Sequence, residues 1–355
     1  MQIKHRSLGI GLLTFVFLFS GCGNKALPDV TQADPIPTVS NFQHIPSDIS
    51  STFAVDDKTL VVNADVIFAE KIPASKVVLL PVSEEITKIA EDFSLTQTQA
   101  AVDGSTVYYQ NDSDGNTVRT LKVNSNGCVN YLDIANDINP PKSIDADHVF
   151  DPYYITSTMP SGINVSAAKA AEDVAALMES YTCFSFIPWN VCAYEAMDEN
   201  DTGAYYIQLV PAYNGIPISI HSNVQDLALW VNAKYSNTGI FSFQGTFVFT
   251  HEKSEELTSF VTPDHVVESL GSNFHLLAQG DKITIDRISL QYYAEQDSNG
   301  TCILKPVWVL EGTEYMSEKI TGYAPITERF TALYWAEDGS LLDMFSGSSG
   351  TATVS

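Results

Sequence analysis

From residue 166 to residue 179 the chain reads Ser-Ala-Ala-Lys-Ala-Ala-Glu-Asp-Val-Ala-Ala-Leu-Met-Glu. Small and apolar residues recur there at every third or fourth position, and the charged residues fall between them. This spacing predicts a helix with one buried face. Ser166 or Asn164 can cap the helix, because a side-chain oxygen accepts a hydrogen bond from an unpaired N–H group of the first turn. The alanines let the helix lie close to a sheet.

A strand is predicted after this helix, beyond a turn-rich segment at residues 198–203. From Tyr205 to Val210 the residues alternate between two faces, which is the period of a β-strand. Further strands are predicted at residues 227–235 and 240–250, and the four phenylalanines between residues 241 and 249 fall on one face of the latter. Helix and sheet therefore form one unit, which we place at residues 163–260.

A second helix-then-sheet unit is predicted at residues 261–346. Thr262 and Pro263 have the residue types of a helix cap and a first helical position, and apolar residues at helical spacing follow as far as Phe274. The strand pattern of residues 283–292 changes phase at Asp286-Arg287, as a β-bulge requires. Strands at residues 301–310, 329–336 and 341–345 complete the predicted sheet.

The N-terminus has the residue order of a secretory signal. Lys4 and Arg6 precede an apolar run from Leu8 to Phe19, which is too short to span a membrane comfortably. Small residues and Cys22 follow, and this order resembles the lipobox of bacterial lipoproteins, whose cysteine is diacylated and becomes the mature N-terminus. The resemblance implies a signal peptide at residues 1–21, lipid attachment at Cys22, and a location at the extracellular face of the cell membrane. Residues 22–50, which are rich in proline, are predicted to be a stalk.

Between the stalk and the first unit, residues 51–135 are predicted to form an N-terminal α+β module. Strand patterns surround one short helix that Ser83 caps; they lie at residues 60–68, 76–80, 106–110, 117–123 and 128–134. A linker is predicted at residues 136–162, which contain Pro140-Pro141 and an acidic patch from Asp145 to Asp151. Residues 347–355 are predicted to be a frayed tail.

The composition limits the classes of partner. The formal net charge is −25 at pH 7, and 45% of the residues are hydrophobic, which describes an acidic globular protein rather than a disordered chain. An acidic surface repels polyanions, so we exclude nucleic acid as a partner. With 355 residues, the chain is long enough for two or three domains.

Several local motifs resemble chemical sites, and each has a simpler explanation. Ser166 and Lys169 match the Ser-x-x-Lys pair of penicillin-recognising enzymes, but no Lys-Thr-Gly or Ser-Asp-Asn motif follows, and a capping serine explains the pattern. Residues 251–255 lack the second histidine of a zinc-protease helix, and we predict a loop there. The acidic turns at residues 112–116 and 198–203 lack the closing glutamate of an EF-hand, so turn formation explains them, although calcium binding stays open. We therefore predict no catalytic residue, no metal site, no cofactor and no enzyme activity.

The sequence leaves the redox state of four cysteines open; they are Cys128, Cys183, Cys192 and Cys302. An exported location permits disulfides. If residues 186–189 turn the chain, Cys183 and Cys192 meet and can form a bridge. If the segment runs straight as a strand, their Cα atoms lie far beyond the ~7 Å limit for a disulfide. We expect the straight strand and no bridge.

The order of motifs over residues 160–346 resembles tandem PepSY-like units. The sequences that carry the resemblance are Tyr213-Asn-Gly-Ile-Pro217, Asn237-Thr-Gly-Ile240, Ile285-Asp-Arg-Ile-Ser-Leu-Gln-Tyr292, Leu304-Lys-Pro-Val-Trp308 and Ala336-Glu-Asp-Gly-Ser-Leu-Leu342. The chain is similar to extracytoplasmic regulators of sensor kinases and to uncharacterised lipoproteins of Gram-positive bacteria. The resemblance implies an α+β fold of tandem modules, each with a helix packed on an antiparallel sheet of PepSY or cystatin-like type.

The same resemblance implies a function in binding or regulation without catalysis. The expected partner is a membrane or cell-surface protein, and the lipid anchor supplies the contact with the membrane. A ligand-binding lipoprotein that captures a peptide or a glycan is the alternative, so a small-molecule ligand stays open. A glycan binder is expected to change its tryptophan fluorescence with oligosaccharides, whereas a regulator is expected to co-purify with a membrane protein.

Overall fold

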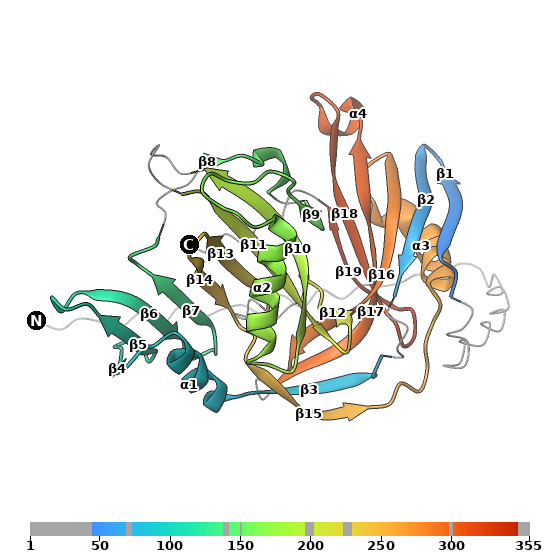
Figure 1. Cartoon of the computed structure of the whole chain (residues 1–355). Helices are drawn as coiled ribbons and strands as arrows, with labels where there is room; N and C mark the ends of the chain where they lie inside the picture. The colour runs from blue at the N-terminus through green and yellow to red at the C-terminus, as the bar shows by residue number, and fades with distance from the viewer. Residues whose placement is uncertain are drawn as a thin grey trace, which may run out of the picture. The chain divides into compact units, whose positions relative to one another are not determined.

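The computed structural model describes residues 45–68, 73–137, 142–149, 151–195, 202–222, 229–297 and 301–346. Within these ranges the chain forms two mixed β-sheets, one of eight strands and one of eleven (Figure 1). None of the helices in the described ranges is long and apolar enough to cross a membrane. Cys22, the predicted site of lipid attachment, lies outside the described residues.

The larger sheet has the strand order β4-β5-β6-β7-β14-β13-β11-β10-β8, with β12 beside β11 and β9 beside β10. Its strands are β4 (Gln97–Ala100), β5 (Thr106–Asn111), β6 (Thr117–Val123), β7 (Val129–Asp133), β8 (Lys142–Ser143), β9 (Tyr154–Ile155), β10 (Ser185–Glu195), β11 (Ala204–Tyr213), β12 (Ile216–Pro217), β13 (Val231–Ser236) and β14 (Gly239–Gly245). A short helix, α1 (Ser83–Asp92), precedes β4, and a 3-10 turn (Ala146–His148) follows β8.

The helix α2 (Ala167–Glu179) packs on β10 and β11 (Figure 1). Ala170, Val174 and Met178 on its apolar face are fully buried, as their spacing predicts. The Oγ atom of Ser166 accepts a hydrogen bond from the backbone N–H of Lys169 at 3.3 Å. The predicted helix and its predicted cap are therefore confirmed. In α1, by contrast, Ser83 is the first helical residue and Val82 is the capping residue, without a side-chain hydrogen bond.

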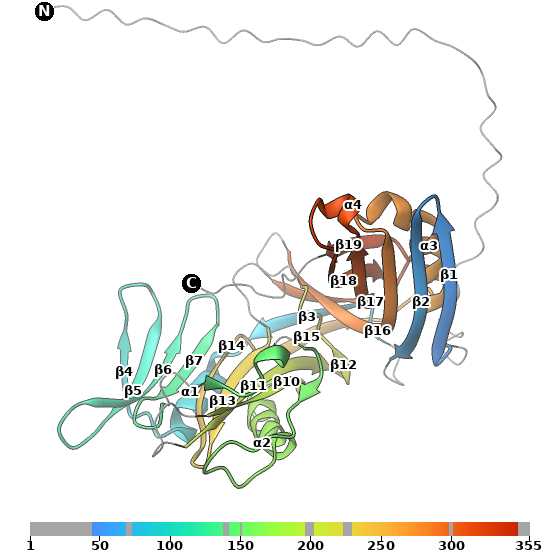
Figure 2. The same ribbon diagram turned by 90° about the horizontal axis from the view of Figure 1, so that it is seen from above.

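The smaller sheet has the strand order β1-β2-β16-β17-β18-β19, and β3 pairs with both β17 and β15. Its strands are β1 (Asp48–Val55), β2 (Lys58–Ile67), β3 (Lys76–Pro81), β15 (Phe249–Glu255), β16 (Lys282–Gln296), β17 (Cys302–Met316), β18 (Ile326–Trp335) and β19 (Leu341–Ser346). The helix α3 (Pro263–Leu277) packs against β1 and β2, and β2 lies between β1 and β16 in Figure 2. A short helix, α4 (Glu318–Thr321), joins β17 to β18.

The predicted fold class, an α+β fold of tandem helix-on-sheet modules, is wrong. The protein is mostly β, and each sheet combines strands from distant parts of the sequence. Residues 51–135 contribute β1, β2 and β3 to the smaller sheet and β4 to β7 to the larger one. The physical reason is that hydrophobic periodicity specifies which face of a strand is buried but not which strand lies next to it.

The chain passes from the larger sheet to the smaller one between Gly245 and Phe249. The single strand predicted at residues 240–250 is therefore two strands, β14 and β15. Phe241 also departs from the predicted common face, because it is the extra residue of a β-bulge where β14 pairs with β13. Residues 251–255, which we predicted to be a loop, belong to β15 and pair with β3 (Figure 1).

One hydrophobic core continues through both sheets and includes residues such as Val191 from β10 and Leu60 from β2. A segment that we call the inter-sheet segment, residues 216–222, connects the larger sheet to β16. Ile218 forms a parallel bridge with Tyr292. The backbone N–H of Ser219 donates to the carbonyl oxygen of Tyr292 at 2.7 Å, and the Oγ atom of Ser222 accepts from the N–H of Ala294 at 2.9 Å. The two sheets are thus joined by hydrogen bonds as well as by the core.

Candidate binding pocket

Asp286 is the extra residue of a β-bulge in β16. The registers of β16 with β17 and with β2 both shift between Ile285 and Arg287, so the bulge predicted from the change of phase is confirmed. Bulges re-aim side chains and occur often beside functional sites. This one brings Asp286 and Arg287 to the wall of a pocket of about 330 Å³. The rest of the wall comes from Pro152-Tyr153, Glu311–Thr313 and Arg329–Thr331.

The pocket lies on the face of the smaller sheet opposite the core. Arg287 pairs with Glu311, and Glu311 pairs with Thr331, so these three side chains share one face. Arg329 is two residues from Thr331 along β18 and lies on the same face. Ile285 belongs to the opposite face and is fully buried in the core. The sheet therefore separates the apolar core from a face that carries charges.

Arg287 and Glu311 form an ion pair that is largely removed from water. The Nε atom of Arg287 lies 3.4 Å from the Oε2 atom of Glu311, and the two side chains are 27% and 16% exposed. Both atoms are buried and have no hydrogen-bond partner among the described residues. Burial raises the pKa of Glu311, and the positive charges of Arg287 and Arg329 oppose that rise. The two arginines therefore offset only part of the free energy that the Glu311 carboxylate loses when it is removed from water.

Tyr153 covers one side of this ion pair. The Cζ atom of Arg287 lies 3.8 Å from the centre of the Tyr153 ring, and the ring of Trp189 meets that ring edge-on at 4.8 Å. Burial, reinforced by the charge of Glu311, raises the pKa of Tyr153 to about 12. The backbone φ of Tyr153 is +61°, a conformation that costs free energy for a residue with a side chain. Such strain often marks functional positions.

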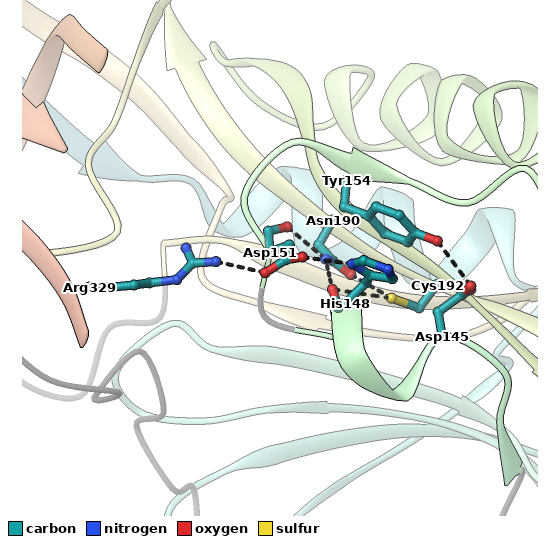
Figure 3. Close-up of polar contacts among 7 residues, drawn as sticks. All are labelled: Asp145, His148, Asp151, Tyr154, Asn190, Cys192 and Arg329. Carbon is teal, nitrogen blue, oxygen red and sulfur yellow. Dashed lines mark hydrogen bonds and ion pairs between the residues drawn. The ribbon is translucent and has the colours of Figure 1, made fainter. Parts of the chain in front are cut away.

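A network of hydrogen bonds holds the segment with Tyr153 against β10 (Figure 3). The Nδ2 atom of Asn190 donates to the backbone oxygens of His148 and Asp151, both at 2.8 Å. Asp145 accepts from the backbone N–H of Ala193 at 2.7 Å and from the hydroxyl of Tyr154 at 3.0 Å. These contacts fix the position of the pocket wall, because each end of the segment is bonded to the same strand.

Asp151 connects this segment to the smaller sheet (Figure 3). Its Oδ1 atom lies 2.8 Å from the Nη2 atom of Arg329, and its Oδ2 atom lies 2.8 Å from the Nδ1 atom of His148. The Arg329 and Asp151 side chains are 48% and 42% exposed. An exposed pair of this kind stabilises by only about 0–1 kcal/mol, so Arg329 can exchange this carboxylate for another without a large loss.

Cys192 lies within the same network, but its environment opposes nucleophilic chemistry. Its sulfur contacts the Oδ1 atom of Asn190 at 3.1 Å and the backbone oxygen of His148 at 3.8 Å. Burial, together with the negative charges of Asp145 and Asp151, raises the pKa of the thiol to about 11. The thiolate is the reactive form of cysteine, so this environment disfavours the reactive form at neutral pH.

The other residues singled out by the sequence have structural roles in the fold. Lys169 pairs with Glu172 and Asp173 at 2.9 Å each on the exposed side of α2. Asp112 accepts hydrogen bonds from the backbone N–H groups of Asp114 and Asn116, which is the pattern of a turn. No group of His, Cys, Asp and Glu side chains suited to a metal ion occurs within the described ranges. Residues 198–201 of the second acidic turn are outside them.

Between Cys183 and Cys192 the chain enters the strand β10, which has a bulge between Pro188 and Asn190 but does not turn back. This is the extended alternative, for which we expected no bridge. Residues Ser185–Glu195 form β10, and both thiols are free, as are those of Cys128 and Cys302. Burial raises the pKa of Cys183 to about 11 and that of Cys302 to about 12.

Trp308 occupies a core position. It is fully buried, and its Nε1–H group donates to the backbone oxygen of Val261 at 2.8 Å.

The pocket residues were only partly visible in the sequence. The change of phase at Asp286-Arg287 predicted the bulge, and Asp151 and Tyr153 stood in a segment predicted to be a linker. Glu311 and Arg329 were not singled out. One signal was available for Glu311, because it follows the apolar run Val307–Leu310 within a single strand pattern. A charged residue that directly continues a buried strand is a candidate functional residue, because charged side chains are rarely buried without a partner.

No family model and no curated protein matches this chain. Among solved structures, the chain is similar to an uncharacterized protein from Eubacterium rectale ATCC 33656, with a TM-score of 0.56 and 16% identity. That alignment covers 86% of this chain and 95% of the other. It shows a shared fold.

A second solved structure is the YpeB C-terminal domain of Bacillus megaterium, with a TM-score of 0.30 and 11% identity over 75% of this chain and 98% of that domain. No argument about fold or function follows from a likeness at this level. The resemblance of residues 160–346 to PepSY-like units therefore stays a prediction from the sequence.

Proposed function

We propose that this protein is an exported, lipid-anchored binding protein, and that the pocket beside the β16 bulge is its ligand-binding site. The observation that carries the proposal is the ion pair of Arg287 and Glu311, which is largely removed from water beside a strained Tyr153 in a pocket of about 330 Å³. Ligand sites in proteins are concave and contain a few convergent polar groups with perturbed environments. The pocket lies at the lower end of the usual range of volumes, about 300–1,000 Å³, and suits a small ligand.

The proposed location rests on the sequence. The apolar run from Leu8 to Phe19 followed by Cys22 supports export and lipid attachment. A Cys22→Ser variant is expected to leave the membrane fraction, because two acyl chains bind a bilayer far more firmly than one. Partition of this variant with membranes as complete as that of the parent would contradict the anchor.

The binding role is tested with the full-length chain in detergent. We expect at least one member of a set of amino acids, short peptides and soluble oligosaccharides to bind saturably in calorimetry. The same ligand should change the tryptophan fluorescence, because Trp189 contacts Tyr153 at the pocket. Trp189→Phe should remove most of that change.

A matched pair of variants connects binding with the pocket. Thr313 and Thr327 are both exposed on the smaller sheet, and only Thr313 lines the pocket. Thr313→Phe should fill part of the pocket and weaken binding at least tenfold, whereas Thr327→Phe should not. The proposal fails if no member of the set binds, or if both variants bind as the parent does.

A second candidate function is regulation of a membrane protein through a sheet edge. All four residues of the edge strand β4 are exposed, and an unpaired edge can accept a strand from a partner. Crosslinking of the lipidated chain in native membranes is then expected to give one specific protein product. Thr313→Phe should leave that product unchanged, which distinguishes this function from ligand capture.

A further inference from the structure

We propose that the pocket binds a small zwitterion, with an ammonium group at Asp286 and Glu311 and a carboxylate at Arg329. The ligand class is a free α-amino acid or a peptide of about two residues. This inference rests on the proposed binding function, and it adds the chemistry of the ligand.

The charges around the pocket are separated across the sheet. Asp286 is on β16, Glu311 on β17 and Arg329 on β18, and these are consecutive strands. Neighbouring strands are about 5 Å apart, so the acidic and basic sides of the pocket lie within the length of a small molecule. A ligand with one positive and one negative end can face both sides at once.

Arg287 is already committed to partners within the protein. Its guanidinium lies over the Tyr153 ring at 3.8 Å, and its Nε atom is the one paired with Glu311 at 3.4 Å. The second basic group, Arg329, forms one ion pair among the described residues, with Asp151, and that pair is nearly half exposed. A guanidinium has five N–H donors, so Arg329 can donate hydrogen bonds to a ligand carboxylate while it keeps its pair with Asp151.

Glu311 provides the corresponding acidic position. Its nearest cation, Arg287, lies at 3.4 Å without a hydrogen bond to the buried Oε2 atom, and its side chain retains 16% exposure. A ligand ammonium at the exposed part of this carboxylate adds a second positive charge and three N–H donors. Asp286 is exposed at the bulge and contributes further negative potential on the same side.

Ligands with other charge patterns fit less well. A simple anion faces the three carboxylates of Asp151, Asp286 and Glu311, and a simple cation faces two guanidinium groups. A neutral sugar commonly stacks on an exposed aromatic face. In this pocket one face of Tyr153 is covered by Arg287, and its ring is in contact with Trp189. The zwitterion is the class whose charges match both sides.

The test uses calorimetry on the full-length chain in detergent, with each of the standard L-amino acids and with L-alanyl-L-alanine. We expect at least one zwitterion to bind with a stoichiometry of one. The N-acetyl derivative of that ligand lacks the ammonium charge, and its amide lacks the carboxylate. Each derivative is expected to bind at least tenfold more weakly. Comparison of the amino acids with the dipeptide distinguishes a free amino acid from a peptide as the source.

Two charge-removing variants test the assignment of each end. Arg329→Gln should weaken the zwitterion at least tenfold and leave its amide unaffected, and Arg119→Gln, in an ion pair of the other sheet, is the matched control. Glu311→Gln should weaken the zwitterion and leave the N-acetyl derivative unaffected, with Glu255→Gln on β15 as its control. Thermal melting confirms that all four variants are folded.

The inference is overturned if the N-acetyl derivative and the amide bind within threefold of the parent zwitterion, or if no zwitterion binds. Binding of an oligosaccharide that Thr313→Phe abolishes would overturn the ligand class and leave the proposed function intact. Absence of any pocket-dependent binding would overturn both.

Discussion

The helices α2 and α3 follow the same sequence plan, but their sheets are completed in different ways. α2 packs on β10 and β11, which come directly after it in the chain. α3 packs against β1 and β2, which come from the N-terminal end of the described chain, and β2 pairs with β16 in parallel. A repeated local pattern therefore leads to one unit that is local in sequence and one that depends on a distant segment.

The largest expected effect comes from removing that distant segment. A chain truncated to residues 145–346 retains α2 and α3 but lacks β1 to β8. We expect it not to fold cooperatively, because α3 loses β2, whose Leu60 and Val62 are buried in the core. Burial of each such side chain contributes roughly 1.5–3 kcal/mol against a total stability of about 5–15 kcal/mol. Urea unfolding followed by circular dichroism checks this, with residues 45–346 as the control. A cooperative transition in the shorter chain would show that the unit containing α3 does not depend on the distant strands β1 and β2.

A matched pair of leucines distinguishes the two helix environments. Leu60 on β2 and Leu209 on β11 are both 0% exposed. We expect Leu60→Ala and Leu209→Ala each to lower the free energy of unfolding by roughly 2–5 kcal/mol. Hydrogen exchange should become faster mainly in α3 and β16 for Leu60→Ala, and mainly in α2 and β10 for Leu209→Ala. The same exchange pattern in both variants would show that the two environments unfold together.

The next prediction concerns His221, which lies in the inter-sheet segment. Its ring stacks on Phe345 of β19 at 4.9 Å, and burial lowers its pKa from 6.5 to about 4, with the charge of Asp343 opposing the shift. Between these pH values the unfolded chain binds a proton that the folded protein excludes, so stability is lost as the pH falls. The loss at pH 4 is about 3 kcal/mol from the stated shift.

The measurement is urea unfolding of the parent and of His221→Gln at pH 7 and at pH 4. The parent should lose more free energy of unfolding than the variant does over this interval, since glutamine has no proton to bind. Equal losses in the two proteins would mean that His221 is not buried in the neutral form.

The smallest expected effect concerns the close approach of α3 to β1. A Cβ atom added at Gly271 would lie 2.3 to 2.5 Å from three ring atoms of Phe53. Alanine favours a helix by about 1 kcal/mol over glycine, and overpacking costs about 1–3 kcal/mol. We therefore expect Gly271→Ala to lower stability by about 1 kcal/mol in chemical denaturation. The same substitution in a Phe53→Leu background should be neutral or stabilising, and a gain in the parent background would contradict the contact.

Local features of the fold could be predicted from the sequence because neighbouring residues determine them. The period of three and four places Val174 and Met178 on the buried face of α2, and the change of phase at Asp286 predicts the bulge. Each follows from the spacing of residues within one element. The same reasoning correctly predicted most strands.

The pairing of strands could not be predicted in this way. The pattern of β2 is compatible with any neighbour that covers its apolar face, and nothing within residues 58–67 indicates Lys282–Ser289 as the partner. For the same reason the pocket was not predicted. Tyr153, Arg287 and Arg329 are far apart in the sequence, and they meet because β18 and the segment before β9 are placed by contacts with other strands.

The parallel pairing of β2 with β16 also determines the order in which the protein can fold. As the chain is synthesised, β2 is complete long before its partner, since Ile67 ends β2 and Lys282 begins β16. At about 5–20 residues per second, the partner strand begins to emerge only about 10–40 s later. During that interval the apolar face of β2 lacks its native cover and is exposed to aggregation and to chaperones. The smaller sheet is therefore one of the last parts of the molecule to form, although its first strands are the earliest to be synthesised among the described residues.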